Sequence, residues 1–115
     1  PATGVAFVLT NAVDGERLGM CGVAQWSDAD EAQFGYWLAA DARGHGAATR
    51  AATLMTAWLL ELGAARVFVT IDSTNSHSTA VALRAGLTFE RTILDVDDHT
   101  GVPIETEVCA ATPER

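Results

Sequence analysis

The segment Ala42-Arg43-Gly44-His45-Gly46-Ala47-Ala48-Thr49-Arg50 stands between a strand-like run, Gln33 to Leu38, and a helix-like run, Gly46 to Leu62. A loop that passes two glycines and enters a helix presents backbone N–H groups with no side chains in the way. These groups and the positive end of the helix dipole favour an anion. Arg43 adds a charge suited to a phosphate oxygen. The segment predicts an anion site at a helix N-terminus, or else a plain turn into a helix.

The length and composition predict one globular domain spanning residues 1–115. Of the 115 residues, 49% are apolar, which is enough to bury a core. The net charge of −8 argues against a protein that binds nucleic-acid phosphates. No apolar run approaches the roughly 20 residues of a membrane-spanning helix, and we expect a cytoplasmic protein with no membrane partner.

Three strands are predicted before the glycine-containing loop. Val5–Leu9 and Gly19–Trp26 form a hairpin, and Glu31–Leu38 follows with alternating faces. One face carries Phe34, Tyr36 and Leu38, and the other carries Glu31, Gln33, Gly35 and Trp37. Gly35 inside a strand indicates either a bulge or a place where a ligand approaches the backbone.

The loop is followed by a helix with Gly63 as its C-terminal cap. Its buried stripe is expected to be Ala48, Ala51, Met55, Trp58 and Leu62, with Thr56 off this stripe. A central strand, Arg66–Ile71, and a second helix, Ser76–Ala85, come next. A hairpin of Leu87–Val96 and Ile104–Ala110 ends the pattern.

The order β-β-β-α-β-α-β-β predicts an α/β (α+β) fold. Its sheet is mixed, largely antiparallel and twisted, carries two helices and contains one right-handed βαβ crossover.

Two common phosphate-binding motifs are excluded by spacing. A Walker loop needs Gly-Lys-Ser/Thr at the helix start, whereas Gly46 is followed by Ala47 and Ala48. The dinucleotide fingerprint needs a small residue where Thr49 stands, and it also needs the loop directly after the strand.

The sequence instead resembles the GNAT superfamily of acyl-CoA N-acyltransferases, over about Val5 to Ala110. The family's pyrophosphate loop, Arg/Gln-x-x-Gly-x-Gly/Ala, is matched by Arg43, Gly46 and Ala48. Three further segments resemble above all the branch that acetylates ribosomal-protein N termini. They are the splayed-strand segment Gly35-Tyr36-Trp37-Leu38, the Asn-x-x-Ser helix start Asn75-Ser76-His77-Ser78, and the helix ending Arg84-Ala85-Gly86-Leu87.

The resemblance implies acetyl-CoA as co-substrate, no metal, and a primary amine as acceptor, either a protein N-terminus or a small amine. By similarity, the backbone of Tyr36, Trp37 and Leu38 contacts the pantetheine arm, and Asn75 contacts it from the far side. Ser78 is implied near the sulfur as the acid for the departing thiolate. The implied pyrophosphate ligands are Arg43, Gly44, His45, Gly46, Ala47, Ala48 and Thr49.

The sequence also departs from the resembled branch. A Glu that acts on the incoming ammonium is common where Gln33 stands, and Gln cannot be a base. Glu31 shares that face and is our candidate base, with Asp72 a weaker one. The family has a strand and helices before the part seen here, so we expect upstream residues or a homo-oligomer to cover the exposed sheet.

Alternative functions stay open at this point. The chain could be a non-catalytic CoA-binding or assembly domain that retains the cofactor loop, or a binder of another phosphorylated ligand. Cys21 and Cys109 fall in strand-like runs and are expected to be buried thiols. Histidines 45, 77 and 99 lack metal-ligand spacing, and His77 is interpreted as a residue of the helix start.

Overall fold

The computed structural model describes residues 6–10, 13–39, 46–97 and 99–113. The elements are β1 (Ala6–Thr10), β2 (Arg17–Trp26), β3 (Glu31–Leu38), α1 (Ala47–Glu61), β4 (Arg66–Asp72), α2 (Ser76–Arg84), β5 (Thr88–Val96) and β6 (Pro103–Ala111). The predicted order is confirmed, and β3 has its predicted bounds.

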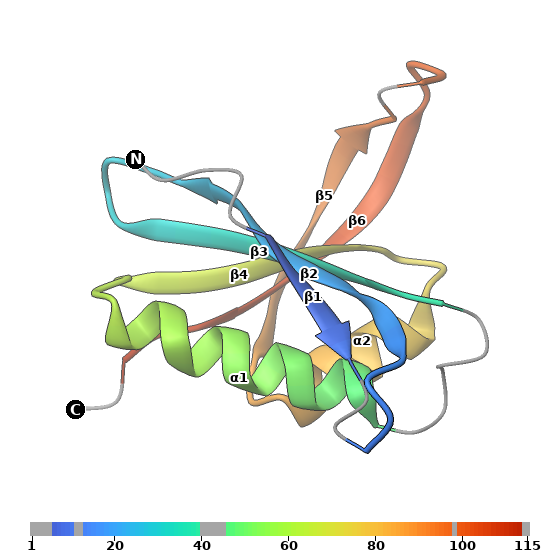
Figure 1. The fold of residues 1–115 in the computed structure, drawn as a ribbon. Helices are drawn as coiled ribbons and strands as arrows, with labels where there is room; N and C mark the ends of the chain where they lie inside the picture. The colour runs from blue at the N-terminus through green and yellow to red at the C-terminus, as the bar shows by residue number, and fades with distance from the viewer. Residues whose placement is uncertain (1–5, 11–12, 40–45, 98, 114–115) are drawn as a thin grey trace.

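The strands form one mixed sheet in the order β1-β2-β3-β4-β6-β5. Every neighbouring pair is antiparallel except β3 and β4, which are parallel and joined through α1. Both helices lie on the same face of the sheet, and hairpin β5–β6 projects away from β1–β3 (Figure 1). The predicted mixed, largely antiparallel α+β architecture is therefore confirmed.

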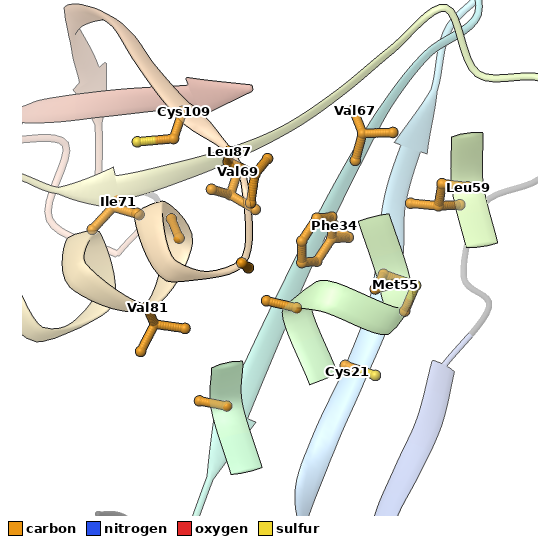
Figure 2. Close-up of a cluster of buried hydrophobic side chains, with 14 of the residues drawn as sticks. Cys21, Phe34, Met55, Leu59, Val67, Val69, Ile71, Val81, Leu87 and Cys109 are labelled. Carbon is orange, nitrogen blue, oxygen red and sulfur yellow. The ribbon is translucent and has the colours of Figure 1, made fainter. Parts of the chain in front are cut away.

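The core lies between the sheet and the two helices (Figure 2). Alternate residues of β4 point into it, and Leu59 of α1 and Leu87, just after α2, are 0% and 2% exposed. Cys21 and Cys109 are both buried free thiols, as expected, and burial raises the pKa of each. The largest fully buried side chains are Leu59, Leu87, Val67, Val108 and Cys109.

Helix α1 buries a wider face than the predicted stripe. Ala48, Ala51 and Met55 are buried, but Leu62 is 55% exposed. The prediction for Leu62 is wrong because the helix ends at Glu61, and Leu62 is the cap residue, beyond the helical period. Thr56 was expected off the stripe but is only 7% exposed. The buried face of α1 also includes Ala52 and Leu59, and Thr56 lies on this part of the face.

Strands β3 and β4 separate soon after they begin. Their pairing joins Glu31 to Arg66, Ala32 to Val67 and Gln33 to Phe68, and no later pair is formed between them in the described chain. Near the separation, Gln33 Nε2 donates a hydrogen bond to Thr70 Oγ1 at 3.0 Å. The two strands therefore open a wedge toward the C-terminal half of β3, as the resemblance implied.

The face of the sheet away from the helices carries an exposed apolar row. Val8, Met20 and Trp37 are cross-strand neighbours and are 51%, 46% and 62% exposed. Gly35 pairs with Gly22 in regular register, and the irregularity of this strand pair lies between Val23 and Gln25. The bulge interpretation of Gly35 is therefore wrong, and no atom lies within 4 Å of a Cβ placed there.

An ion pair links β5 to β4 at the end of β4 that is still paired with β3. Both oxygens of Glu90 accept hydrogen bonds from Arg66, whose guanidinium also lies over the Phe68 ring. The Arg66 hydrogen bonds hold the pKa of Glu90 below its ordinary value of 4.5. A carboxyl with a lowered folded-state pKa stabilises the fold above its unfolded pKa, and this contribution disappears as the pH falls through the folded value.

We therefore expect Glu90→Gln to lower the free energy of unfolding by about 1 kcal/mol at neutral pH. The difference from wild type should vanish at acidic pH, where Glu90 is protonated in both the folded and the unfolded chain. Urea unfolding in steps from pH 7 to below the lowered folded-state pKa of Glu90 checks this. An equal difference at every pH would mean that packing, and not charge, holds β5 to β4.

Candidate active site

A groove runs between β3, the start of α1 and the start of α2. Its volume is about 510 Å³. The lining residues come from these three parts of the chain: Tyr36, Trp37, Leu38, Ala48, Asn75, His77 and Ser78. The backbone of β3 forms one wall, because β3 has left its partner β4 by this point.

The N-terminus of α1 closes one end of the groove. Gly46 adopts a left-handed φ of 75° as the N-cap, and no side chain among the described residues caps the helix. No acidic residue stands in the first turn of α1, so none within that turn neutralises the positive end of the helix dipole. A smaller cavity of about 120 Å³ adjoins it, lined by Leu38, Gly46, Ala47, Ala48, Thr49, His77, Val81 and Arg84. Arg43, Gly44 and His45, also predicted here, lie outside the described residues.

The start of α2 fixes the position of Ser78. Asn75 is the N-cap, and its side-chain oxygen accepts a hydrogen bond from the Ser78 N–H at 3.1 Å. Just before it, one carboxylate oxygen of Asp72 accepts hydrogen bonds from the N–H and hydroxyl of Thr74. These bonds lower the pKa of Asp72. The turn and cap together orient the first residues of α2 toward β3.

A third cavity, of about 230 Å³, occupies the wedge between β3 and β4. It is lined by Phe34, Gly35, Tyr36, Val69, Thr70, Ile71, Asp72, Asn75 and Ser78. Tyr36, Asn75 and Ser78 also line the groove, so the two cavities share a wall. These three residues place Ser78 at the border between the groove and the wedge.

The Tyr36 hydroxyl is buried at this shared wall. It has no hydrogen-bond partner of ordinary geometry among the described residues. Burial raises the pKa of Tyr36, and the nearby Ser78 side chain lowers it in part, although the two groups do not meet the geometry of a hydrogen bond. Cys109 also raises this pKa by charge interaction.

Glu31 is not brought to the same place. It lies at the opposite end of β3, where it pairs with Arg66 at 3.6 Å. Its distance from Tyr36 is roughly 16 Å along a strand. Glu31 lines none of the three cavities described above. The role of Glu31 as a base therefore stays a prediction without support from proximity, whereas Asp72 does face the wedge.

Three residues of α2 that line the cavity at the start of α1 are not predicted as site residues from the sequence: His77, Val81 and Arg84. His77 is interpreted there as an ordinary helix-start residue and Arg84 as part of a helix ending, yet both line the cavity at the start of α1. The signal is present, because His77, Val81 and Arg84 stand at i, i+4 and i+7 and so share one face of α2. From the sequence alone, however, it cannot be told what this face of α2 packs against. The structure shows that α2 packs against α1.

Neither a metal cluster nor a membrane-spanning helix is found in the part of the chain that the structure describes. No group of three or more His, Cys, Asp and Glu side chains there is placed to hold a metal ion. No described helix is both long and apolar enough to cross a membrane.

Solved structures share the fold of this chain. A Vibrio cholerae chain assigned as a ribosomal-protein-serine acetyltransferase superposes with a TM-score of 0.83 and 24% identity, over 94% of this chain and 63% of that one. The microcin C7 self-immunity acetyltransferase, in complex with acetyl-CoA and AMP, superposes with a TM-score of 0.79 and 24% identity, over 94% of this chain and 61% of that one. The dodecameric spermidine N-acetyltransferase from Vibrio cholerae superposes with a TM-score of 0.79 and 14% identity, over 93% of this chain and 63% of that one.

The chain thus spans less than two thirds of the length of these solved chains. No curated protein matches its sequence. Residues 1–88 match the family model described as acetyltransferase (GNAT) domain, which is most of the 115 residues. On that match, and in agreement with the splayed β3 and the groove beside it, the chain belongs to the GNAT acetyltransferase family.

Proposed function

We propose that this chain is an N-acetyltransferase that moves an acetyl group from acetyl-CoA to a primary amine by direct attack on the thioester. The observation that carries this proposal is the separation of β3 from β4. It leaves one edge of β3 beside a groove that ends at Ser78. An extended pantetheine arm can hydrogen bond to such an edge in the manner of an added strand.

The residues around the groove fit acetyl-CoA. The uncapped start of α1, with Arg84 nearby, suits the pyrophosphate, as the family's loop does. The side-chain oxygen of Asn75 is used by the Ser78 N–H, so its amide NH₂ is the part available to the pantetheine arm. Acetyl-CoA supplies the activated acyl group, and the chain's own groups hold it and handle protons.

The chemistry needs positioning more than a covalent intermediate. A neutral amine entering the wedge meets a thioester held against β3, and fixing the two reactants contributes much of the rate enhancement. A backbone N–H of β3 polarises the carbonyl. We assign the Ser78 hydroxyl to the departing sulfur. Asp72, which also faces the wedge, is suited to attract the cationic acceptor before it loses its proton.

Ser78→Ala should lower kcat for acetyl transfer by about 100-fold, because proton transfer by a positioned group contributes on the order of 10²-fold or more. The KM for acetyl-CoA should change little. Glu31→Gln is the comparison, since Glu31 lies at the far end of β3 beside Arg66. Release of free CoA in the presence of an amine measures both rates. A larger loss in Glu31→Gln would reverse these assignments.

The acceptor and assembly are parts of the same proposal. Two of the solved chains named above are assigned as acetyltransferases of a ribosomal-protein serine and of spermidine, and we propose a protein N-terminus or a small amine as acceptor here. We place the reaction in the cytoplasm, where acetyl-CoA is available. The exposed row of Val8, Met20 and Trp37 supports a homo-oligomer, as in the dodecameric relative.

One observation favours a second candidate, a CoA-binding or assembly domain without turnover. Gln33 stands where the resembled branch has a Glu, and its amide is bonded to Thr70. Calorimetric titration of acetyl-CoA, followed by CoA-release assays with a short peptide and with spermidine, separates the two. Binding with no release by either amine favours the second candidate. No binding by a folded chain would remove both.

A further inference from the structure

Two described residues have buried hydroxyl oxygens without a hydrogen-bond partner, Tyr36 and Thr56. Leaving such a group unpaired costs on the order of 1–3 kcal/mol, so each needs an explanation. Thr56 lies on α1 and lines none of the cavities described above. Tyr36, by contrast, lines both the groove and the wedge, and it does so beside Ser78.

Three elements, β3, α2 and β6, determine where the Tyr36 side chain lies relative to Ser78. It comes from the part of β3 that has left β4, and it faces the helices because alternate residues of β3 do. Asn75 holds the backbone of Ser78 at the start of α2, opposite this strand. Tyr36 also packs against the buried core cluster that includes Cys109 of β6, and Glu107 on the same strand accepts a hydrogen bond from Thr79 at 3.0 Å.

We infer that Tyr36 and Ser78 form a two-hydroxyl relay that protonates the departing CoA sulfur, an inference that rests on the proposed acetyl transfer. Ser78 borders the groove and touches the sulfur, and Tyr36 acts through Ser78 from its buried position. Tyr36 is therefore a positioning and proton-supplying residue. Its backbone role toward the pantetheine arm is separate from this role of its side chain.

The proton transfers of the relay balance. The amine nitrogen forms a bond to the acyl carbon, and the bond from that carbon to sulfur breaks. The sulfur takes the Ser78 hydroxyl proton while Ser78 Oγ takes the proton of the Tyr36 hydroxyl. The proton that the amine nitrogen loses passes through water to the Tyr36 oxygen, so both hydroxyls are restored.

The acidities of the groups explain why a tyrosine serves here. A serine hydroxyl alone is a weak acid, whereas a phenol has an ordinary pKa of 10.0 and a thiol one of about 8.5. The phenol is thus much closer to the leaving thiol in acidity than a serine hydroxyl is, which suits a proton donor. Burial raises the pKa of Tyr36 further, so the protonated phenol releases its proton only in concert with the proton that returns from the amine.

The test is a double-mutant cycle on acetyl transfer. Tyr36→Phe, which keeps the ring, should lower kcat about 10- to 100-fold with little change in the KM for acetyl-CoA. Groups that act as one unit are non-additive, so Tyr36→Phe with Ser78→Ala together should be no more than about twofold slower than Ser78→Ala alone. Thr56→Val is the matched control, because it also removes a buried unpaired hydroxyl, and it should leave kcat unchanged.

The outcomes separate the relay from the proposed function. If wild type transfers acetyl and Tyr36→Phe does so equally fast, the relay is wrong and the acetyltransferase stands. If the two losses multiply in the double variant, Tyr36 acts independently of Ser78 and the relay is again wrong. If wild type binds acetyl-CoA but acetylates neither the peptide nor spermidine, the proposed function fails, and the relay fails with it.

Discussion

Gly46→Glu is expected to weaken acetyl-CoA binding by at least about 100-fold, equal to roughly 3 kcal/mol. Gly46 caps α1 at a φ of 75°, a conformation that residues with a Cβ rarely adopt. A glutamate there brings a negative charge to the helix end where the cofactor phosphates are proposed to bind. Its Cβ would also lie 3.1 Å from the Arg50 guanidinium, so Arg50 must shift.

The matched control for this variant is Gly63→Glu. Gly63 lies just beyond the other end of α1 with a φ of 109°, so the substitution imposes the same charge and a similar backbone strain. It is one helix length away from the groove. Calorimetric titration of both variants, with thermal unfolding to compare their stabilities, isolates the local effect. Equal losses of affinity would show that strain, and not charge at the start of α1, weakens binding.

Gly19→Ala should lower the free energy of unfolding by about 3 kcal/mol, the upper part of the range for overpacking. A Cβ at Gly19 would collide with the Trp37 carbonyl oxygen and lie 2.8 Å from the Leu38 Cα. These are backbone atoms of the paired strand, so the clash cannot be relieved by a change of rotamer. Because a domain is stable by only about 5–15 kcal/mol, this loss is large.

The same substitution should also weaken acetyl-CoA binding, because Trp37 and Leu38 line the groove. Gly35→Ala is the control for stability. Gly35 lies in the neighbouring strand β3, and a Cβ added there meets no atom within 4 Å, so the free energy of unfolding should change by less than about 1 kcal/mol. Urea unfolding of the two variants checks this. Similar stabilities would mean that β2 can move away from β3 without cost.

The sequence predicted the elements well, because local patterns specify them. The alternation of β3 and the glycines at both ends of α1 set those bounds within a residue or two. Asn75 was expected at the start of α2 and is the N-cap there. The prediction failed where packing decided the outcome, as with Thr56, which is buried although it stood off the predicted stripe.

For the candidate site, the sequence supplied the residues of the strand, the helix start and the Asn75–Ser78 turn, because each has its own local motif. The sequence did not show that these three segments come together around one groove. The insertion of β6 between β4 and β5 and the approach of Arg84 to the start of α1 became known only from the structure.

The sequence by itself therefore determined the order of elements, the glycine at the start of α1 and the Asn75 start of α2, since these depend on residues a few positions apart. Only the tertiary structure decided which of those residues meet. It brings Tyr36 and Ser78 together and keeps Glu31 with Arg66 at the other end of β3. Such contacts depend on strand pairing and helix packing between segments tens of residues apart, which no local pattern records.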